Sequence, residues 1–517
     1  MSKLVTVEQA IELIKSGDTI ATGGFVGNMH PEFITKSIEE AYLSSGQPRN
    51  LSLIFAAGQG DGKDKGLNHL GHEGLVTKVI GGHWGLIPKI QKLALENKVV
   101  AYNLPQGSIS QLYRAVAGKK PGILTKVGIK TFVDPRLEGG KINNITSEDI
   151  VKVMEIDGEE YLFYKSFKVD VAIIRGTYAD EDGNCVFTKE CSNLEMLSMA
   201  QAARNCGGKV ILQVEKVVQK GSLDYSQVKI PGIYVDAIVE APMEYHMQTF
   251  GEQYNPSYSQ EVIVPMNKIK PMSFDVRKII ARRAAMELVP NAITNLGIGM
   301  PEGVSMVANE EGVSGVVLTT EAGTIGGVPA GGQSFGAASN AQAIIDQPYQ
   351  FDFYDGGGLD IAFLGLAQCD KKGNVNVSKF GPKIAGCGGF INISQTAKKV
   401  VYCGTFTAGK SKLEVKDGKL IINEDSSVIK FIGNVEQVTF SGEYAYEVGQ
   451  PVKYITERAV FELTEKGLTL TEIAPGVDLN KDVLDKMDFK PHISEELKLM
   501  DEKIFREEPM GLNKLVS

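Results

Sequence analysis

Hydrophobic and polar residues follow a repeated pattern in this chain: a short apolar strand, a glycine-rich loop and the start of a helix. The strand at 19–22 leads into a glycine-rich loop at 23–27 and then into Pro31-Glu32. The strand at 292–296 leads into glycines and then into Pro301-Glu302. Proline suits the first turn of a helix, because the backbone N–H has no intrahelical partner there. The pattern therefore predicts the same supersecondary unit in two places.

Other apolar segments extend this correspondence. A strand and glycine turn at 172–184 match a strand and turn at 362–374, and the strands at 210–214 and 316–318 alternate with helical stretches. This alternation is typical of a mostly parallel sheet covered by helices. We therefore predict an α/β fold with two similar open, mostly parallel-sheet domains.

The correspondence predicts a duplicated chain. The stretch 251–272 is polar, contains prolines and shows no periodicity, so we predict a linker there. The first half then covers 1–250 and the second half 273–517. From about residue 400, alternating stretches predict a β-rich C-terminal extension, and the charged stretch 498–506 predicts a closing helix.

Length and composition agree with two globular domains and exclude several classes of protein. The chain has 517 residues, 43% hydrophobic and 23% charged, enough apolar side chains for more than one core. Its net charge of −9 comes without a basic stripe, which argues against nucleic acid or an anionic membrane as the partner. We find neither a signal-peptide pattern nor an apolar run of about 18 residues, and we expect a cytoplasmic protein.

Cysteine and histidine patterns predict no metal site. The six cysteines contain no C-x-x-C pair and mostly have apolar or glycine neighbours, which predicts reduced, buried thiols; a nucleophilic Cys387 is the alternative. His69 and His72, followed by Glu73, have the spacing of two ligands on a helix, but no third ligand is near, so a structural role is favoured. We expect Trp84 in a core or an interface.

One carboxylate stands where this fold places reactive groups. Glu321 follows the apolar strand at 316–318, and in open α/β sheets ligands bind at the carboxyl ends of the strands. A carboxylate there can act as a base, a metal ligand or a nucleophile. The alternative is a turn carboxylate that caps backbone N–H groups. The stretch 354–360 either places a further carboxylate near Glu321 or forms a turn.

Glycines mark three further candidate sites. The run Gly386-Cys387-Gly388-Gly389 either aims backbone N–H groups at an oxyanion or phosphate, or forms a tight turn. The loops at 23–27 and 297–299 suit phosphate better, because a helix start follows each. Neither matches G-x-G-x-x-G or G-x-x-x-x-G-K-[ST], which argues against a dinucleotide or P-loop site.

Together these motifs resemble family I CoA-transferases, with both halves fused in one chain. The resemblance covers nearly the whole length. It rests on the loops at 23–32 and 297–301, the segment around Glu321, and Gly388-Gly389. Longer strings are similar to the propionate (lactate) and acetate CoA-transferase branch, namely those at 354–360, 385–393 and 455–461.

The resemblance implies a role for each candidate residue. Glu321 is then the nucleophile, and backbone N–H groups of Gly388 and Gly389 bind an oxyanion. Two-subunit relatives commonly read Ser-Glu-Asn-Gly where this chain has Ala322 after the glutamate, so an amide beside the nucleophile is missing here. Gln59 is a candidate second oxyanion donor. The residues implied to contact coenzyme A are Gly23, Gly24, Gly27, Gly297 and Gly299.

The implied activity is exchange of coenzyme A between a short-chain acyl-CoA and a free carboxylate through a glutamyl-CoA thioester. Coenzyme A is then a substrate, and we expect no tightly bound cofactor and no metal. The acid remains open among acetate, propionate, butyrate, lactate and acrylate. The resemblance also implies a homo-oligomer, a tetramer. The alternatives are an acyl-CoA hydrolase on the same scaffold and a non-catalytic sensor of acyl-CoA or sugar phosphates.

Overall fold

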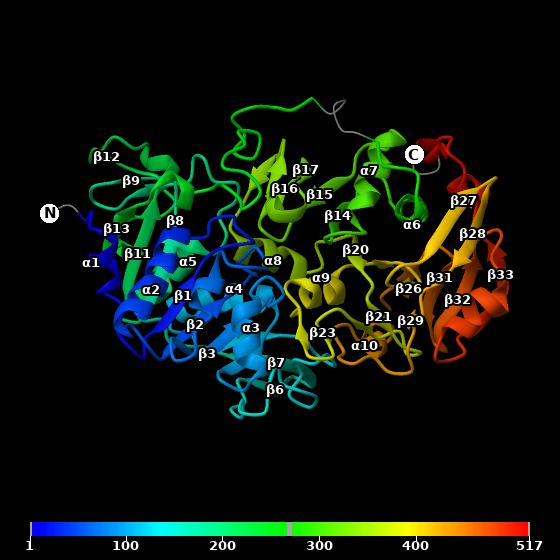
Figure 1. The fold of residues 1–517 in the computed structure, drawn as a ribbon, viewed down its shortest axis with the longest axis horizontal. Helices are drawn as coiled ribbons and strands as arrows, with labels where there is room; N and C mark the ends of the chain where they lie inside the picture. The colour runs from blue at the N-terminus through cyan, green and yellow to red at the C-terminus, as the bar shows by residue number, and fades with distance from the viewer. Residues whose placement is uncertain (1–2, 266–270, 515–517) are drawn as a thin grey trace. The chain divides into compact units, whose positions relative to one another are not determined.

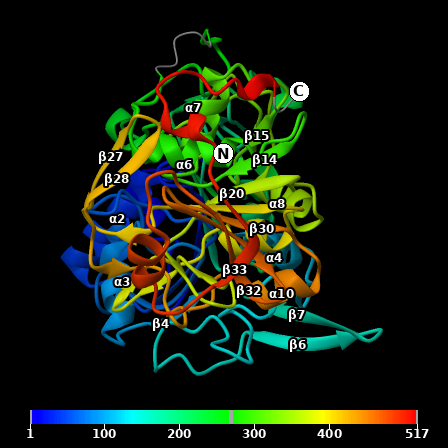
Figure 2. The ribbon, with the colours of Figure 1, turned by 90° about the vertical axis from the view of Figure 1, so that its right-hand side faces the viewer.

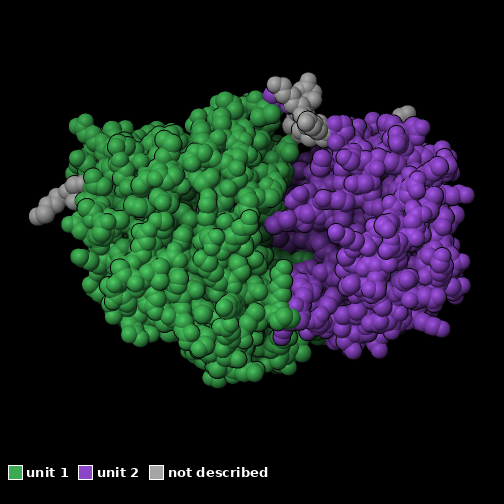
Figure 3. Space-filling model, viewed as in Figure 1, with its two compact units in different colours: residues 1–264, 320–352, 382–392 green, residues 265–319, 353–381, 393–517 purple. Residues whose placement is uncertain are grey.

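The computed structural model describes residues 3–265 and 271–514. The chain forms two compact units, coloured green and purple in Figure 3. Unit 1 comprises residues 1–264, 320–352 and 382–392, and unit 2 comprises residues 265–319, 353–381 and 393–517. Unit 1 therefore takes in two segments that lie far along the chain. Part of the predicted linker, 266–270, lies outside the described residues, and the division into halves at 251–272 stays a prediction.

Unit 1 is built around a parallel sheet (Figure 1). The chain builds outward from β1 to β4 on one side of the sheet and from β8 to β13 on the other, so its direction switches between β1 and β8. Every neighbouring pair in this sheet is parallel. The order is β13 (Ala237–Glu240), β11 (Lys209–Val214), β8 (Val171–Arg175), β1 (Thr19–Thr22), β2 (Leu51–Phe55), β3 (Val76–Gly81) and β4 (Val100–Asn103).

Helices cover both faces of this sheet, as a parallel sheet requires to keep its strands from water. Side chains of α1, α2 and α3 share one core with strand residues such as Ile20 and Leu53. On the other face, Leu112 of α4 lies with Ile54 and Ile80, and α5 packs against α4 and β8. The bounds are α1 (Val7–Ile11), α2 (Glu32–Ser45), α3 (Pro88–Leu95), α4 (Gln106–Ala117) and α5 (Met196–Asn205).

Shorter elements complete unit 1. Figure 2 shows the antiparallel β6–β7 hairpin as a projecting ribbon. The short strands are β5 (Gly122–Thr125), β6 (Val151–Ile156), β7 (Glu159–Lys165), β9 (Tyr178–Asp180), β10 (Cys185–Val186), β12 (Lys216–Val218), β16 (Thr324–Ile325), β17 (Val328–Pro329), β18 (Ala338–Ser339), β19 (Ala343–Ile344) and β24 (Lys383–Ile384). Single 3-10 turns are η1 (Leu67–Leu70), η2 (Tyr225–Gln227), η3 (Gly232–Tyr234), η4 (Met243–Tyr245) and η6 (Gly332–Ser334).

Unit 2 repeats the parallel plan and then extends it with antiparallel strands. Neighbours are parallel from β15 to β30, antiparallel through β32, and parallel again at β33. The direction of the chain switches between β14 and β20. The order is β15 (Val317–Thr319), β14 (Ile293–Leu296), β20 (Ile361–Gly365), β25 (Val400–Cys403), β30 (Val452–Ile455), β31 (Ala459–Thr464), β32 (Gly467–Ile473) and β33 (His492–Leu499). This confirms the predicted fold class and the β-rich extension.

The remaining elements of the second half are short. Helices are α6 (Val276–Ala285), α7 (Glu302–Glu310), α8 (Gln347–Asp355), α9 (Phe390–Thr396) and α10 (Gly442–Glu447). Short strands are β21 (Gln368–Cys369), β22 (Val375–Asn376), β23 (Lys379–Phe380), β26 (Thr407–Ala408), β27 (Lys412–Lys416), β28 (Lys419–Glu424) and β29 (Val428–Ile429). Single turns are η7 (Leu479–Val483), η8 (Leu484–Lys486), η9 (Glu502–Phe505) and η10 (Leu512–Lys514). Within the described ranges, no helix is long and apolar enough to cross a membrane.

The predicted closing helix at 498–506 is wrong. Residues up to Leu499 belong to β33, which pairs with β32, and only a 3-10 turn, Glu502–Phe505, follows. Ile504 and Phe505 of that turn are buried in the core of unit 2. Pairing with the edge of an existing sheet satisfies the backbone groups here and overrides the helical propensity of the charged residues.

Candidate active site

The first glycine loop follows β1 at the switch point of the unit 1 sheet, where open α/β sheets bind ligands. Its backbone is strained: Val26 and Met29 have φ of 56° and 57°. A positive φ is costly for a β-branched residue such as Val26. Two hydrogen bonds hold Val26 in place, from its N–H to the Gly58 carbonyl (2.7 Å) and from the Gly60 N–H to its carbonyl (3.0 Å). Strained backbone of this kind gathers at functional sites.

Close packing inside the protein accounts for the three glycines of this loop. A Cβ at Gly23 would lie 2.3 Å from Cε of Met196, and one at Gly27 would lie 2.4 Å from the Phe250 ring. A Cβ at Gly24 would lie 2.9 Å from Cδ of Gln59. These glycines let side chains of unit 1 press against the loop, and their contact with coenzyme A remains a prediction.

The side chain of Gln59 is buried, and its hydrogen bonds support the first glycine loop. Its Nε2 donates to the Thr22 carbonyl (2.8 Å), and its Oε1 lies 2.9 Å from Nδ1 of His30. Burial lowers the pKa of His30 to about 4, so its ring is neutral and donates to Gln59. The amide of Gln59 is therefore already engaged in structural hydrogen bonds. We keep it as a support of the loop rather than as an oxyanion donor.

Glu321 occupies a tight turn directly after β15 in the sequence. The Gly323 N–H donates to the Thr320 carbonyl (3.1 Å), which places Glu321 at the second position of the turn. Gly323 has φ of +104°, and a Cβ there would lie 2.0 Å from the Ile345 carbonyl oxygen, so this position requires glycine. Ala322, where two-subunit relatives have the amide, is fully buried. The turn fixes the backbone that carries the carboxylate.

The carboxylate of Glu321 lies against the backbone of Gly389. A Cβ at Gly389 would sit 1.8 Å from Oε2 of Glu321, so only glycine leaves room for the carboxylate. Among the residues that the structure describes, no hydrogen bond or ion pair reaches this carboxylate. Burial raises its pKa to about 7. A carboxylate without a counter-charge in a partly buried position is kept for chemistry rather than for stability.

The glycine loop at 386–389 is anchored to β3, β4 and their following turns in unit 1. The Trp84 and Gly85 N–H groups donate to the Ala385 carbonyl (2.7 and 2.8 Å). The Cys387 N–H donates to Oδ1 of Asn103 (3.0 Å). The Gln106 N–H donates to the Gly388 carbonyl (2.9 Å). Four hydrogen bonds at three neighbouring residues of this segment hold the loop rigidly enough to keep donors in place without reorganisation.

The two predicted oxyanion donors in this loop differ. The N–H of Gly388 donates to the Gly82 carbonyl (2.8 Å), so it is occupied. The Gly389 N–H has no hydrogen-bond acceptor among the described residues. Gly389 also lies nearer to Glu321 than Gly388 does, since a Cβ at Gly388 would meet Gln106 and His83 instead. Gly389 alone therefore stays a candidate donor.

The second glycine loop follows β14 at the switch point of the unit 2 sheet. The Gly297 N–H donates to the Phe363 carbonyl (2.8 Å), which ties the loop to β20. Gly299 has φ of +86°, and no atom lies within 4 Å of where its Cβ would be. Arg277 donates from Nη2 to the Gly299 carbonyl (3.3 Å). An open glycine with a cation beside it and the start of α7 after it suits an anionic ligand.

Other residues singled out in the sequence have structural partners. His69 lies between Glu32 (2.9 Å) and Glu39 (2.5 Å), and His72 pairs with Glu39 (2.6 Å), which confirms their structural role. The described residues contain no group of three side chains that could hold a metal ion. Trp84 is fully buried, as expected.

Cys387 and Asp360, two further residues singled out in the sequence, do not take part in catalysis. Burial raises the pKa of the Cys387 thiol far above its ordinary value, so a nucleophilic thiolate is disfavoured. Asp360, from the stretch 354–360, accepts from the Ile293 N–H (2.9 Å) and pairs with Lys398 (2.8 Å). Asp360 therefore supports unit 2.

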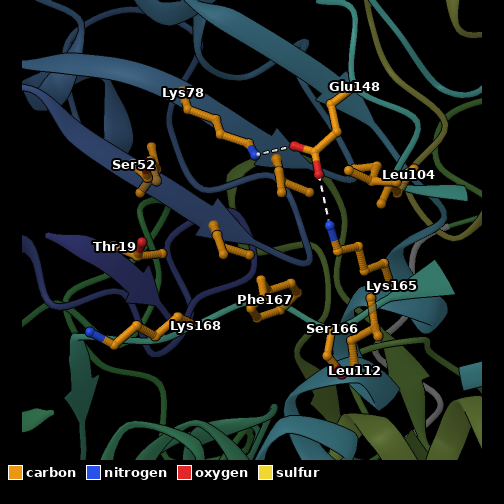
Figure 4. A pocket seen from close by; sticks show the side chains of 14 residues that line it. Thr19, Ser52, Lys78, Leu104, Leu112, Glu148, Lys165, Ser166, Phe167 and Lys168 are labelled. Atoms are coloured by element: carbon orange, nitrogen blue, oxygen red, sulfur yellow. Dashed lines mark hydrogen bonds and ion pairs between the residues drawn. The ribbon is translucent and has the colours of Figure 1, made fainter. Parts of the chain in front are cut away.

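Cavities lie at both edges of the unit 1 sheet. One of about 550 Å³ lies at the carboxyl ends of β8 and β11, and its lining includes Arg175 and Lys216, which pair with Glu190 (3.1 Å) and Glu240 (2.6 Å). Another, of about 180 Å³, lies at the opposite edge, under Thr19 at the start of β1 (Figure 4). Its rim lysines Lys78 and Lys165 both pair with Glu148, so the site already contains their counter-charge.

Sequence reasoning missed three polar side chains behind the anchored loop. Gln106 donates from Nε2 to Oε1 of Gln347 (3.3 Å), and Gln347 donates from Nε2 to Oε2 of Glu195 (3.0 Å). They lie about 90 and 150 residues apart in sequence, read from their numbers, so no local pattern links them. The one available signal was Gln106 itself, a polar residue directly after Pro105 at the end of a strand.

The class of protein follows from comparison with known families and structures. The family model for coenzyme A transferase matches residues 4–241. The chain is 46% identical to caffeate CoA-transferase of Acetobacterium woodii over 100% of both proteins. It is 46% identical to acetate CoA-transferase YdiF of Escherichia coli (strain K12), over 98% of this chain and 96% of that one. The chain belongs to the coenzyme A transferase family.

Solved structures agree with this assignment. The crystal structure of the acyl-CoA transferase YdiF apoenzyme from Escherichia coli O157:H7 superposes with a TM-score of 0.94 at 45% identity, covering 99% of this chain and 97% of that one. A thioester complex of that transferase with CoA gives a TM-score of 0.93 at the same identity and coverage. This chain is an enzyme that transfers coenzyme A between an acyl-CoA and a carboxylate.

Proposed function

We propose that Glu321 is the nucleophile of a ping-pong reaction that moves coenzyme A between short-chain acyl-CoA and free short-chain carboxylates. The observation that carries this proposal is the position of the carboxylate, which lies against Gly389 and has no hydrogen bond or ion pair within the described ranges. Its pKa of about 7 leaves a large fraction ionised at neutral pH. A carboxylate that is not stabilised by a cation is a better nucleophile than one in an ion pair.

The chemistry balances without any other reactant. The ionised oxygen of Glu321 attacks the thioester carbonyl, the C–S bond breaks, and a mixed anhydride and the CoA thiolate form. The thiolate then attacks the Glu321 carbonyl and releases the first acid as its carboxylate. The glutamyl-CoA thioester that remains reacts with the second acid by the same steps in reverse. One thioester is made for each one broken, so no ATP is needed.

Each addition step creates a tetrahedral oxyanion, and we assign its stabilisation to the N–H of Gly389. This group has no other acceptor among the described residues, and the loop that carries it is anchored to unit 1 at Asn103 and Gln106. A preorganised donor of this kind lowers the barrier because it needs no reorientation during the reaction.

We propose, for each unit by itself, that its switch-point glycine loop can contact coenzyme A, as the family resemblance implies. In unit 1, the loop at Gly23–Gly27 follows β1 at the switch point of the sheet, where open α/β sheets bind ligands. In unit 2, Gly299 is open and Arg277 lies beside it. Arginine and the N-terminus of a helix are both suited to phosphate groups.

The identity of the acid needs a panel of substrates. One relative is named for acetate and another for caffeate, and the two are equally similar to this chain. Transfer from propionyl-CoA to acetate, butyrate, lactate, acrylate and caffeate, and from acetyl-CoA to propionate, should be ranked by kcat/KM, the quantity that measures specificity. We propose that the short aliphatic acids rank first; a higher value for caffeate would replace them by an aromatic acid.

The experiment that tests Glu321 is mass spectrometry of the protein mixed with propionyl-CoA without an acceptor acid. We expect a CoA adduct on the peptide that contains Glu321, and none in Glu321→Ala. Glu96→Gln serves as the matched control, because Glu96 is an exposed carboxylate of unit 1 with only a surface partner, Lys92. An adduct on another residue, or exchange at the normal rate in Glu321→Ala, would contradict the proposal.

We also propose that the protein forms a homotetramer, on the strength of the family resemblance. Light scattering coupled to size-exclusion chromatography measures this directly. A mass near four times the 55.9 kDa of the chain is expected, and a monomeric mass would rule the tetramer out.

A further inference from the structure

We propose that Glu195 is a positioning residue that sets the geometry of the loop at 386–389 through Gln347 and Gln106. The inference rests on the proposed role of that loop and of Glu321. All four segments involved belong to unit 1. Among the described residues, no hydrogen bond joins this relay to the Glu321 carboxylate, so its effect on catalysis passes through the position of Gly388 and Gly389.

The burial of the Glu195 carboxyl group does not favour the stability of the fold. The side chain is fully buried, and Oε1 has no hydrogen-bond partner among the residues described by the structure. The residue before it, Leu194, has φ of 51°, in the left-handed region that is strained for a leucine. Buried polar atoms are paired in the great majority of cases, so an unpaired carboxyl oxygen next to a strained residue calls for an explanation.

The relay runs through three consecutive hydrogen bonds. Oε2 of Glu195 accepts from Nε2 of Gln347 (3.0 Å), and Oε1 of Gln347 accepts from Nε2 of Gln106 (3.3 Å). The backbone N–H of Gln106 then donates to the Gly388 carbonyl (2.9 Å). Glu195 thus selects the rotamer of Gln347, because its oxygen is the acceptor that the amide NH₂ of Gln347 faces. Gln347 in turn orients the side chain of Gln106, because its Oε1 accepts the hydrogen bond from Nε2 of Gln106.

Backbone contacts tie the same two segments together, so the relay has a rigid base. The Gln347 N–H donates to the Leu194 carbonyl (3.0 Å). Next to it, Asn193 donates from Nδ2 to Oδ1 of Asp346 (3.0 Å). Because both the backbone N–H and the side chain of Gln347 are held by hydrogen bonds, a displacement of Glu195 also displaces the side chain of Gln347.

The charge state of Glu195 follows from its surroundings. The groups that face it are the carboxylate of Asp346 and the phenol of Tyr113, and no cation is among them. Burial, with a smaller contribution from Asp346, raises the pKa of Glu195 to about 8. Glu195 is therefore protonated at pH 7. It ionises above pH 8 and then places a second negative charge behind a site that must ionise Glu321 and stabilise an oxyanion.

Two substitutions of Glu195 separate the effect of its negative charge from the effect of its hydrogen bond to Gln347. Glu195→Gln is always neutral and keeps an oxygen that can accept from Gln347, so we expect turnover at pH 7 within about threefold of wild type and no fall in kcat above pH 8. Wild type should lose turnover above pH 8. Glu195→Ala leaves the Gln347 amide without its acceptor, and we expect kcat to fall about 10- to 100-fold, because small displacements of catalytic groups carry losses of this size. Gln201→Leu, on α5 and outside the relay, is the matched control.

A double-mutant cycle shows whether the effect passes through Gln347. Gln347→Leu should lower kcat about as much as Glu195→Ala, and the double variant should lose little more, because residues in one network are not additive. Full additivity, normal kcat in Glu195→Ala, or a kcat in Glu195→Gln as low as in Glu195→Ala would overturn the inference. If Glu195→Ala does not fold, the pH profile of Glu195→Gln and the turnover of Gln347→Leu decide. The CoA adduct on Glu321 is scored separately: its absence in wild type refutes the nucleophile, while turnover still reports on the relay.

Discussion

At the scale of single residues, Glu321 and Glu195 of unit 1 form no ion pair with any cation in the described part of the chain, and burial raises the pKa of both. Glu321 has a pKa of about 7 and Glu195 of about 8. By contrast, the buried Glu190 has Arg175 beside it (3.1 Å), and its pKa is lowered despite a burial that opposes this. The presence of a cationic partner therefore distinguishes a carboxylate used for stability from one used for catalysis, whereas burial by itself does not.

The pKa of Glu321 predicts opposite effects of pH on activity and on stability. The nucleophile must be ionised, so the rate of the first half-reaction should rise with pH, reach half its maximum near pH 7, and be lost below it. Between the ordinary carboxyl value of 4.5 and about 7, the folded protein retains a proton that the unfolded chain has released, so this group's contribution to stability falls as pH rises.

Glu321→Gln removes that pH-dependent cost. We expect the variant to be inactive yet more stable than wild type at pH 8, by on the order of 1–3 kcal/mol, since one pKa unit corresponds to about 1.4 kcal/mol. The gain should shrink at pH 5. Thermal unfolding of both proteins at the two pH values measures this, with Glu96→Gln as the reference; an equal gain at both pH values would refute the assigned pKa.

At the scale of elements, the loop at 386–389 works because β3, β4 and the residues after them hold it. Its anchors come from backbone groups of residues 82–85 and from the side chain of Asn103. Gly389 is then pressed against Oε2 of Glu321, where no side chain fits. The loop therefore combines a fixed N–H with a fixed contact to the nucleophile.

Gly389→Ala tests this contact. The new methyl group would overlap Oε2 of Glu321, so we expect the carboxylate to be displaced and kcat to fall by about 10²–10³, the loss typical of a damaged oxyanion site. Gly118→Ala is the matched control, because a Cβ there has no neighbour closer than 3.4 Å. Circular dichroism should show both variants folded. Unchanged kcat in Gly389→Ala would remove Gly389 from the site.

At the scale of the whole molecule, unit 1 is not a continuous stretch of chain. Segments 320–352 and 382–392 belong to it together with 1–264. Ile384 lies in the same core as residues of α1 to α3, and Gln91 bonds its carbonyl from Nε2 (2.6 Å). A large part of the candidate site therefore consists of residues from late in the sequence packed on strands from early in it.

This composition predicts the behaviour of a divided chain. Residues 1–264 expressed alone should unfold at a lower temperature than the intact protein and show no exchange, because the partners of residues 82–85 and of Asn103 are missing. Coexpression with residues 265–517 should restore turnover. The measurement is propionyl-CoA-dependent exchange with acetate, together with thermal unfolding. Activity in residues 1–264 alone would contradict the arrangement of the site.

Features that depend on residues close in sequence could be predicted. The predicted strand at 19–22 is β1 with those bounds. The two strand–loop–helix units begin the sheets of units 1 and 2 at their switch points. Glu321 stood out because it directly follows an apolar strand. Periodicity, capping and turn chemistry act over a few residues, so they can be read from the chain itself.

Features that depend on packing between distant residues could not be predicted. Met196, Gln59 and Phe250 explain the glycines of the first loop, and the Gly82 carbonyl removes Gly388 as a donor. The charged end of the chain formed a strand because β32 offered it an edge. The sequence by itself determined which segments become strands, loops and helix starts, and which carboxylate follows a strand. Only the tertiary structure decided which N–H groups are free and which carboxyls lack a counter-charge, because hydrogen bonding and desolvation depend on neighbours that the chain brings together from far apart.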